Sequence, residues 1–355
     1  MKTTHTAPKL SVVITSYNYA RFVGRAIDSV LSQDVPIEVV VVDDCSTDNS
    51  RDVIASYGQR VIPVFQAVNQ GQGGGFNAGY ARTTGDLILF LDADDFMLPG
   101  AARIILSNAD PDVGMYLYRM RYSDIDDKLG DFFPPLEVPF SQGDISEQLR
   151  MTGNYTYTIT SGIVFSRKAL EQVMPVVAKD FVMGADGYFT ATVPLYSQVR
   201  GFDQAICAYR LHPAQHTQYA RNYAKRGRWQ IQHHQTRFDT IRQHAARLGL
   251  PVADDLGEHD ALHLQERLVS LMFAPEDHPV PTDTRKDLLT KLRRANREQY
   301  GSKALARNSW WILIGILPEG AARTVLSWKI DVHARPVWIN TLGRTLRKSL
   351  GIVSN

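Results

Sequence analysis

Residues 85–95 read Gly85-Asp86-Leu87-Ile88-Leu89-Phe90-Leu91-Asp92-Ala93-Asp94-Asp95. Five consecutive apolar residues between polar ones are typical of a strand that is buried on both faces of a sheet. Three carboxylates follow within four residues, directly after the expected end of this strand. A buried strand that leads into an acidic loop predicts a parallel sheet with a ligand site at the carboxyl ends of its strands.

Three earlier segments repeat the apolar pattern of this strand. Leu10–Ile14, Ile37–Val42 and Val61–Val64 are short apolar runs that we expect to form strands. Apolar residues at helical spacing between 20 and 32 predict a helix after the first of them. Strands that alternate with helices indicate an α/β domain with a mainly parallel sheet flanked by helices.

The middle of the chain is less regular, and its last third changes character again. We expect further strands at Met115–Met120, Tyr157–Phe165 and Ala205–Leu211. After His216 the chain is rich in Arg, His and Gln and has apolar residues at helical spacing. The segments that we expect to be helical are 219–249, 258–273 and 283–299. These changes divide the chain into three parts, which are 1–107, 108–217 and 218–355.

The composition is that of a globular protein. The 355 residues are 44% hydrophobic and 21% charged, which excludes disordered, collagen-like and low-complexity proteins. Two cysteines cannot form a disulfide framework, so we expect a reducing, cytoplasmic location. The polar start Met1–Pro8 does not resemble a secretory signal. The late apolar run Trp310–Leu317 is too short to cross a bilayer, which takes about 20 apolar residues.

The net charge of +2 conceals two oppositely charged parts. Residues 1–210 carry 17 Lys and Arg against 24 Asp and Glu, a net charge of −7. Residues 211–355 carry 22 against 13, a net charge of +9. We therefore expect the two parts to face different partners.

The carboxylates at Asp92, Asp94 and Asp95 allow two interpretations. Like charges this close raise one another's pKa unless a cation lies between them. Mg²⁺ or Mn²⁺ would suit them, because hard cations take oxygen ligands and keep positions open for substrate phosphates. Alternatively, the three residues form a solvated loop that caps the helix after Pro99. The triplet alone does not decide between these interpretations.

Four more motifs accompany the acidic strand end, in a fixed order along the chain. They are Thr15-Ser16-Tyr17-Asn18, Val41-Val42-Asp43-Asp44-Cys45-Ser46-Thr47-Asp48, Asn69-Gln70-Gly71 and Asn77-Ala78-Gly79. Together with residues 85–95 they resemble the family 2 glycosyltransferases. The resemblance is strong over residues 9–107 and weaker to about residue 217. It implies a GT-A fold, a Rossmann-like mixed and mainly parallel sheet flanked by helices, with the remaining helices as a C-terminal extension.

The resemblance also implies an activity. Enzymes of this family move a sugar from a nucleotide-diphosphate sugar to an acceptor hydroxyl, with inversion at the anomeric carbon. A UDP-sugar donor is favoured, and the acceptor would be a saccharide or a lipid-linked saccharide. Such a reaction would serve bacterial-type surface polysaccharide or glycoconjugate synthesis.

Site residues follow from the resemblance by position. The expected donor-binding residues are Thr15, Tyr17, Asn18, Asp44, Asn69, Gly71, Asn77, Asp92 and Arg210. Asp92 and Asp94 match the DxD motif and, with His212, would hold the divalent metal, Mn²⁺ or Mg²⁺. Asp186 in Gly184-Ala185-Asp186-Gly187 would be the general base. Helix capping by Asp186, a salt bridge of Arg210 and a structural His212 remain alternatives.

Two positions depart from the family pattern. Phe76 stands where an arginine is usual, so Arg82 or Arg210 would have to supply a cation near the phosphates. Ala185 stands where an acidic residue is frequent, which leaves Asp186 without a carboxylate neighbour. The glycines at 71 and 73–75 are expected to let the backbone approach the donor closely.

Other functions fit the sequence less well. Gly73–Ala78 matches a loose dinucleotide-binding pattern, but it does not follow the first strand, which argues against a dehydrogenase. A nucleotidyltransferase and a catalytically inactive nucleotide-binding module remain as alternatives.

The C-terminal tail combines basic and aromatic residues. Residues 299–355 contain eight Lys and Arg against two acidic residues, interleaved with Trp310, Trp311, Trp328 and Trp338. This pattern suits a helix that lies on an anionic bilayer and attaches the protein peripherally to the cytoplasmic face. Packing against the catalytic domain or against a second subunit of a homo-oligomer is the alternative. Because the basic residues are dispersed among large apolar ones, we expect no nucleic-acid partner.

Overall fold

The computed structural model describes residues 7–212, 223–301, 304–330 and 336. The chain divides into two compact units. The first comprises Met1–Gln218 and His233–Leu256, and the second Tyr219–Gln232 and Gly257–Asn355. The first unit contains the sheet, whereas the described part of the second is helical.

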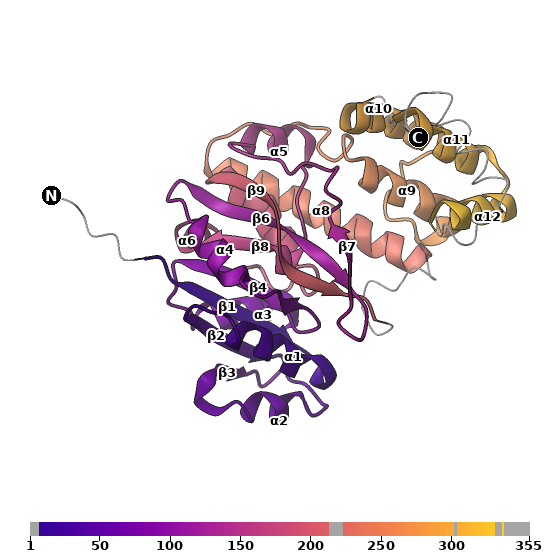
Figure 1. The fold of residues 1–355 in the computed structure, drawn as a ribbon. Coiled ribbons are helices and arrows are strands. Elements are labelled where there is room, and N and C mark those ends of the chain that lie inside the picture. The colour runs from indigo at the N-terminus through magenta and orange to yellow at the C-terminus, as the bar shows by residue number, and fades with distance from the viewer. Residues whose placement is uncertain (1–6, 213–222, 302–303, 331–335, 337–355) are drawn as a thin grey trace, which may run out of the picture. The chain divides into compact units, whose positions relative to one another are not determined.

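A nine-stranded sheet forms the centre of the first unit (Figure 1). Its order is β3-β2-β1-β4-β8-β6-β9-β5, and β7 pairs with β6. The strands are β1 (Leu10–Ser16), β2 (Ile37–Asp43), β3 (Ile62–Phe65), β4 (Leu87–Asp92), β5 (Phe96–Met97), β6 (Val113–Ser123), β7 (Leu129–Phe133), β8 (Ile163–Ser166) and β9 (Gln198–Arg210). Strands β3, β2, β1 and β4 are parallel, and β8 is antiparallel to β4. The predicted α/β class with a mixed sheet is confirmed.

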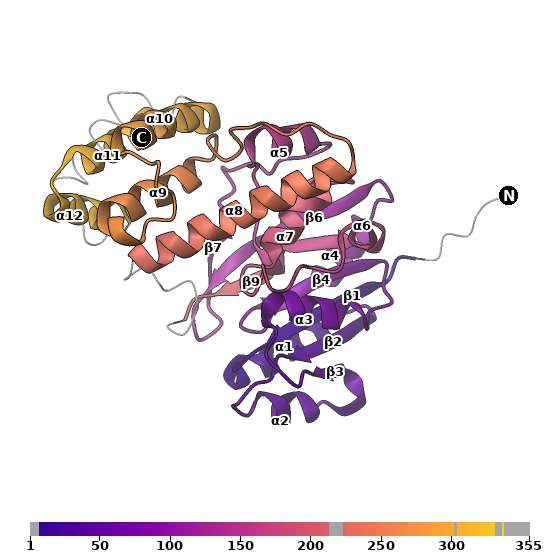
Figure 2. The same cartoon turned by 180° about the vertical axis from the view of Figure 1, so that it is seen from behind.

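Helices cover both faces of this sheet (Figures 1 and 2). One face packs against α1 (Ala20–Leu31), α2 (Ser50–Ala55) and α4 (Ala101–Ser107). The other packs against α3 (Gly71–Tyr80), α5 (Ser146–Thr152), α6 (Arg167–Val173), α7 (Asp186–Thr192) and the residues of α8 (Tyr223–Arg247) from His233 onward. Val12 and Val39 face the first set, and Val13 and Val40 the second. This alternation explains the continuous apolar runs, because both faces of each central strand are buried.

Helix α3 is among the helices that the sequence pattern did not predict. Its first five residues include four glycines, which are poor helix formers. A Cβ atom on Gly71 would lie 2.6 Å from the Val182 carbonyl oxygen, and one on Gly73 would lie 2.8 Å from the Phe181 carbonyl oxygen. The missing side chains therefore make room for protein backbone. That these glycines also let the backbone approach the donor stays a prediction.

The predicted strand Tyr157–Phe165 is also shorter than expected. The strand begins only at Ile163, as β8, and Thr160–Gly162 form one 3₁₀ turn, η2. The Ser161 hydroxyl in this turn accepts a hydrogen bond from the backbone N–H of Asp92 at 3.1 Å. The polar turn before β8 thus contacts the acidic end of β4 and does not continue the strand.

The second unit is built from helices around a core of its own. They include α9 (Ala261–Phe273), α10 (Arg285–Tyr300), α11 (Ala304–Ile316) and α12 (Glu319–Ile330). Trp311 and Ile314 of the late apolar run are buried in this core. No helix in the described ranges is both long and apolar enough to span a membrane. Much of the predicted basic tail, including Trp338 and everything after it, lies outside the described residues.

Candidate active site

The carboxyl ends of β1, β2 and β4 meet at one edge of the sheet. In the strand register Thr15 of β1 lies between Val42 of β2 and Asp92 of β4. Ser16, the next residue of β1, pairs with Asp43. The motifs that follow the three strands are therefore adjacent, as the sequence predicted.

The loops after β1 and β2 are tied to each other by side chains. Asn18 has a left-handed backbone with φ of 58°. Its Oδ1 accepts a hydrogen bond from the Thr47 N–H at 2.7 Å. Asp48 in turn accepts from the Ala20 N–H at 3.0 Å. The side chain of Tyr17 remains 41% exposed beside these loops, available to a ligand.

Asp44 holds the loop that leads into α3. Its Oδ1 accepts hydrogen bonds from Gln66 Nε2 at 2.9 Å and from the Gln70 N–H at 2.8 Å. Its Oδ2 accepts from the Gly71 N–H at 2.8 Å, and Asn69 Oδ1 accepts from the same N–H at 3.2 Å. Burial raises the pKa of Asp44, although these hydrogen bonds oppose the shift. Three of the predicted donor-binding residues, Asp44, Asn69 and Gly71, thus belong to one hydrogen-bonded turn.

The acidic end of β4 is a crowded group of carboxylates. Burial raises the pKa of Asp92 to about 8, and the nearby charges of Asp94 and Asp186 add to this shift. Burial also raises the pKa of Asp95, which is almost fully buried and accepts a hydrogen bond from the Arg210 N–H at 3.1 Å. The predicted crowding is present, and a cation between the carboxylates would relieve it.

Asp94 and His212, two of the predicted metal ligands, are in direct contact. His212 Nε2 is 3.1 Å from Asp94 Oδ2, and the histidine is buried. Its ring lies against Phe22, with centroids 4.5 Å apart. Tyr19 also hydrogen-bonds to Asp94, and burial raises the pKa of this phenol, which keeps it neutral. Across the described ranges, no three His, Cys, Asp or Glu side chains are grouped to hold a metal ion.

Asp186, the predicted base, is the first residue of helix α7. Burial raises its pKa, and the positive charge of Arg237 opposes this shift. Arg237 is buried and its Nε donates to the Gly187 carbonyl oxygen at 3.4 Å. The charge of Asp186 contributes to the raised pKa of Asp92, so these two carboxylates lie near each other.

Gln72 links the two sides of this site, and the sequence analysis missed it. Its Nε2 donates to Asp92 Oδ1 at 2.9 Å, and its Oε1 accepts from the Ala185 N–H at 2.9 Å. Glutamine carries no chemical signature of such a role. Only its place beside Gly71 in a family motif could have drawn attention to it.

Two other predicted residues are engaged by the protein itself. Asn77 donates to the Val176 carbonyl oxygen at 2.9 Å and accepts from the Val176 N–H at 2.8 Å. Arg210 is buried, pairs with Asp127, and donates from Nε to the Asp94 carbonyl oxygen at 2.9 Å. These contacts give both residues a structural task, and a direct contact with the donor stays a prediction.

Phe76, which stands where the family usually has an arginine, faces the core. Phe76 is fully buried, with its ring centroid 4.3 Å from that of Phe90 and 5.9 Å from that of Phe189. Arg82 is exposed and follows the opposite end of α3, about 15 Å along the helix from Gly71. Arg82 is therefore poorly placed to replace the missing phosphate-binding cation.

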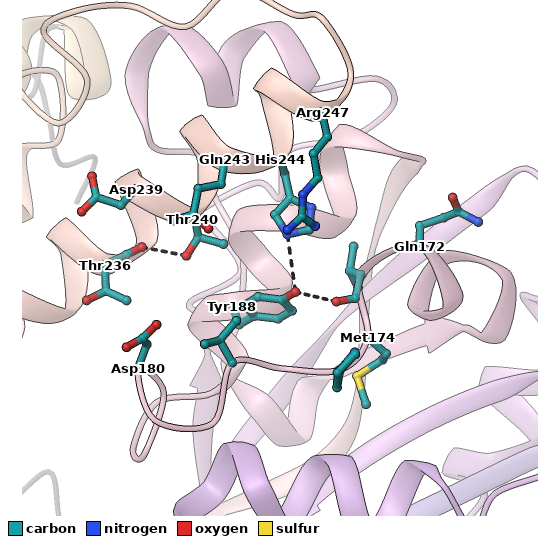
Figure 3. Close-up of a pocket in the computed structure, with 13 residues that line it drawn as sticks. Gln172, Met174, Asp180, Tyr188, Thr236, Asp239, Thr240, Gln243, His244 and Arg247 are labelled. Atoms are coloured by element: carbon teal, nitrogen blue, oxygen red, sulfur yellow. Dashed lines mark hydrogen bonds between the residues drawn. The ribbon is translucent and has the colours of Figure 1, made fainter.

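A separate pocket of about 350 Å³ lies among α6, α7 and α8 (Figure 3). Asp92, Asp94 and Asp186 do not line it. The Tyr188 hydroxyl donates to the Val173 carbonyl oxygen and lies 3.4 Å from His244 Nε2. The other ring nitrogen of His244, Nδ1, is 2.9 Å from the Tyr196 hydroxyl. Burial, helped by the charge of Arg247, lowers the pKa of His244 to about 4, so this ring is neutral at pH 7. No sequence pattern predicted this pocket.

Comparison with known proteins shows which family this chain resembles. The family model "Glycosyl transferase family 2" matches residues 11–174. An uncharacterised glycosyltransferase of Nostoc sp. is 39% identical over 213 residues, which are 58% of this chain and 66% of that protein. The succinoglycan biosynthesis protein ExoO of Rhizobium meliloti is 40% identical over 105 residues, 29% of this chain and 30% of its own length.

A lipid-linked saccharide features in the name of another relative. The GalNAc(5)-diNAcBac-PP-undecaprenol beta-1,3-glucosyltransferase of Campylobacter jejuni is 32% identical over 108 residues, 29% of this chain and 35% of that protein. The matched regions thus span less than two thirds of each relative's length.

Solved structures align over most of the chain at low identity. The UDP complex of Staphylococcus aureus TarS 1–349 aligns over 90% of this chain and 91% of its own, with 18% identity and a TM-score of 0.49. The resemblance seen in the sequence motifs is confirmed by the family match and by the relatives. Residues 11–174 of this chain form a family 2 glycosyltransferase domain.

Proposed function

We propose that this protein transfers a sugar from a nucleotide-diphosphate sugar to an acceptor hydroxyl, with inversion at the anomeric carbon. One observation carries the proposal: the Gln72 amide joins the acidic end of β4 to the start of α7, with hydrogen bonds of 2.9 Å to Asp92 Oδ1 and from the Ala185 N–H, directly before Asp186. The donor would lie at the carboxyl ends of β1, β2 and β4, against Thr15, Tyr17, Asn18 and the turn held by Asp44. Residues 1–107 would form the donor half, 108–217 the acceptor half, and 218–355 the extension.

Asp186 would act as the general base. Its carboxylate would accept the proton of the acceptor hydroxyl while the oxygen attacks the anomeric carbon and the nucleotide diphosphate leaves from the opposite face. A positioned base contributes about 10²- to 10⁴-fold in rate. The charge of Arg237 favours the ionised form of Asp186, which is the form that a base needs.

A divalent metal, Mn²⁺ or Mg²⁺, fits the residues at the end of β4. Asp92, Asp94 and His212 would hold it, and their oxygen and imidazole atoms are suitable ligands. The contact between Asp94 Oδ2 and His212 Nε2, 3.1 Å apart, supports this assignment, because it brings two candidate ligands together. When bound, the metal would neutralise charge on the leaving diphosphate.

The partners follow from the family and the relatives. A UDP-sugar is the favoured donor, and a saccharide or lipid-linked saccharide of surface polysaccharide synthesis is the proposed acceptor. The names of two relatives, a succinoglycan biosynthesis protein and an undecaprenol-linked glucosyltransferase, support this choice.

We also propose a peripheral position on the cytoplasmic face of the membrane, through α11. Leu305, Leu313 and Ile316 of this helix are 74%, 41% and 68% exposed. Arg307 lies exposed on the same helix. Apolar and basic side chains on one helix suit an anionic bilayer surface.

The Asp186→Asn variant tests the reaction. UDP-glucose, UDP-galactose, UDP-N-acetylglucosamine and GDP-mannose would be screened with Mn²⁺ for release of the nucleotide diphosphate. The variant should lose about 10²-fold or more in turnover but keep its calorimetric affinity for UDP and Mn²⁺. Asp144→Asn is the control, because Asp144 is an exposed carboxylate whose Oδ1 accepts a hydrogen bond from the Ser146 N–H at the start of α5.

Two results would contradict the assignment. They are unchanged turnover in Asp186→Asn, or a loss of UDP binding together with turnover. The Asp94→Ala variant should lose both turnover and the metal-dependent part of UDP affinity. Release of pyrophosphate from a nucleoside triphosphate, with no nucleotide-sugar consumed, would instead indicate a nucleotidyltransferase.

A further inference from the structure

We propose that Gln72 is a positioning residue, which fixes the donor-side carboxylate of Asp92 relative to the start of the base helix α7. This inference rests on the proposed function, because Asp92 and Asp186 are the groups that it would align. The observation behind it is a single side-chain amide that bonds both sides of the site at once.

Both ends of the Gln72 side-chain amide form hydrogen bonds. Nε2 donates to Asp92 Oδ1 at 2.9 Å, and Oε1 accepts from the Ala185 N–H at 2.9 Å. Ala185 is the N-cap residue of α7, and Asp186 is the first residue of that helix. A planar amide with both ends bonded has little freedom, so Asp92 and the start of α7 are held in one relation.

Ala185 cannot cap α7 with its own side chain. In a capping box, a glutamate or glutamine three residues into the helix reaches back to the N-cap N–H. Here Gln72 supplies that acceptor from another helix, α3. The base helix therefore depends on α3 for a contact that other helices make internally.

The backbone of α3 reinforces the link. The Gln72 N–H donates to the Val182 carbonyl oxygen at 2.8 Å, and the Gly73 N–H donates to the Phe181 carbonyl oxygen at 3.1 Å. Gly71 has a left-handed φ of 71° and no room for a Cβ. The glycines thus bring α3 close enough for Gln72 to reach Ala185.

The chemistry of residue 72 explains why a glutamine is suitable. A glutamate would still accept from the Ala185 N–H, but it would place a second negative charge against Asp92. A methionine keeps the length of the side chain and removes both hydrogen bonds. The two substitutions therefore distinguish the hydrogen bond to Asp92 from the hydrogen bond to Ala185.

Turnover should depend on this link more than donor binding does. A displacement of about 1 Å in an active site can cost about 10²-fold in rate. We expect Gln72→Met to lower kcat about 10- to 100-fold, with KM for the nucleotide-sugar within about three-fold of the parent value.

Gln33→Met is the matched control for general loosening of the fold. Gln33 is also half-buried and also joins two elements through its amide. Its Nε2 donates to the carbonyl oxygens of Ser29 and Leu98 at 2.9 and 3.0 Å, and its Oε1 accepts from the Ala102 N–H at 3.1 Å. It contacts none of the site carboxylates in these bonds, so Gln33→Met should keep its kcat.

Hydrogen–deuterium exchange gives a readout that does not need turnover. In Gln72→Met the Ala185 amide should exchange about ten-fold faster or more, since its acceptor is gone. Gln72→Glu should keep the protection of Ala185 and still lose kcat, whereas Gln33→Met should change neither.

Three outcomes would overturn the proposal. They are an Ala185 amide that stays protected in Gln72→Met, full kcat in Gln72→Glu, or an equal loss of kcat in Gln33→Met. If the parent protein consumes no nucleotide-sugar, the proposed function fails, and Ala185 exchange still decides whether Gln72 holds α7.

Discussion

The Phe76→Arg variant should unfold the first unit instead of adding a phosphate-binding cation. Arginine is the residue that the family pattern leads one to expect at this position. In this protein the Phe76 side chain is fully buried and stacked on Phe90, with ring centroids 4.3 Å apart. An arginine there would replace a packed ring with a charge in an aromatic core.

The expected loss of stability has two parts. Truncation of a buried phenylalanine to alanine costs about 3–5 kcal/mol, of which the aliphatic stem of arginine would recover a fraction. An uncompensated buried charge costs about 3–5 kcal/mol more. The sum is comparable to the whole stability of a typical protein, about 5–15 kcal/mol. Phe76→Leu keeps most of the volume and should cost only about 1–2 kcal/mol.

The assay has to resolve the two units. Trp310, Trp311 and Trp328 lie in helices of the second unit, so the tryptophan fluorescence reports mainly on that unit. Exchange of the amides in β1 and β4 reports on the first unit. We expect Phe76→Arg to lose protection in these strands while the tryptophan emission stays nearly unchanged. Parent-like protection together with tighter UDP binding would refute the reasoning, because residue 76 would then face the ligand.

Two further predictions concern the second unit and the pocket. Leu305 and Ile316 are both exposed on α11. The double variant Leu305→Glu with Ile316→Glu should no longer sediment with phosphatidylglycerol vesicles but should still sediment with UDP-agarose. Unchanged vesicle binding would argue against membrane attachment by this helix. His244 has a pKa of about 4 in the folded protein, against about 6.5 in an unfolded chain. The stability that it contributes is therefore complete above about pH 6.5 and is lost as the pH falls toward 4. His244→Gln should lose less unfolding free energy between about pH 7 and 4.5 than the parent does, and equal losses would contradict a neutral buried ring.

Local sequence patterns determined the architecture of the first unit and the family. The apolar runs at Leu10–Ile14 and Leu87–Leu91 specify strands buried on both faces, and parallel strands bring their carboxyl ends to one edge. That rule alone placed Asp92 and Asp94 beside the loops after β1 and β2. The pairing of Asp94 with His212 came from the family resemblance, and the structure brings the two side chains to 3.1 Å.

Tertiary structure alone decided which side chains are available to a ligand. Gln72 bonds Ala185 across 113 residues, and Asn77 bonds Val176 across 99. No spacing in the sequence encodes such contacts, because they depend on how α3 packs against the segment before α7. The same packing turns Phe76 into the core, where the family pattern suggested a phosphate-facing residue. The sequence thus specified which residues gather at the end of the sheet, and the packing of α3 determined how they are held there.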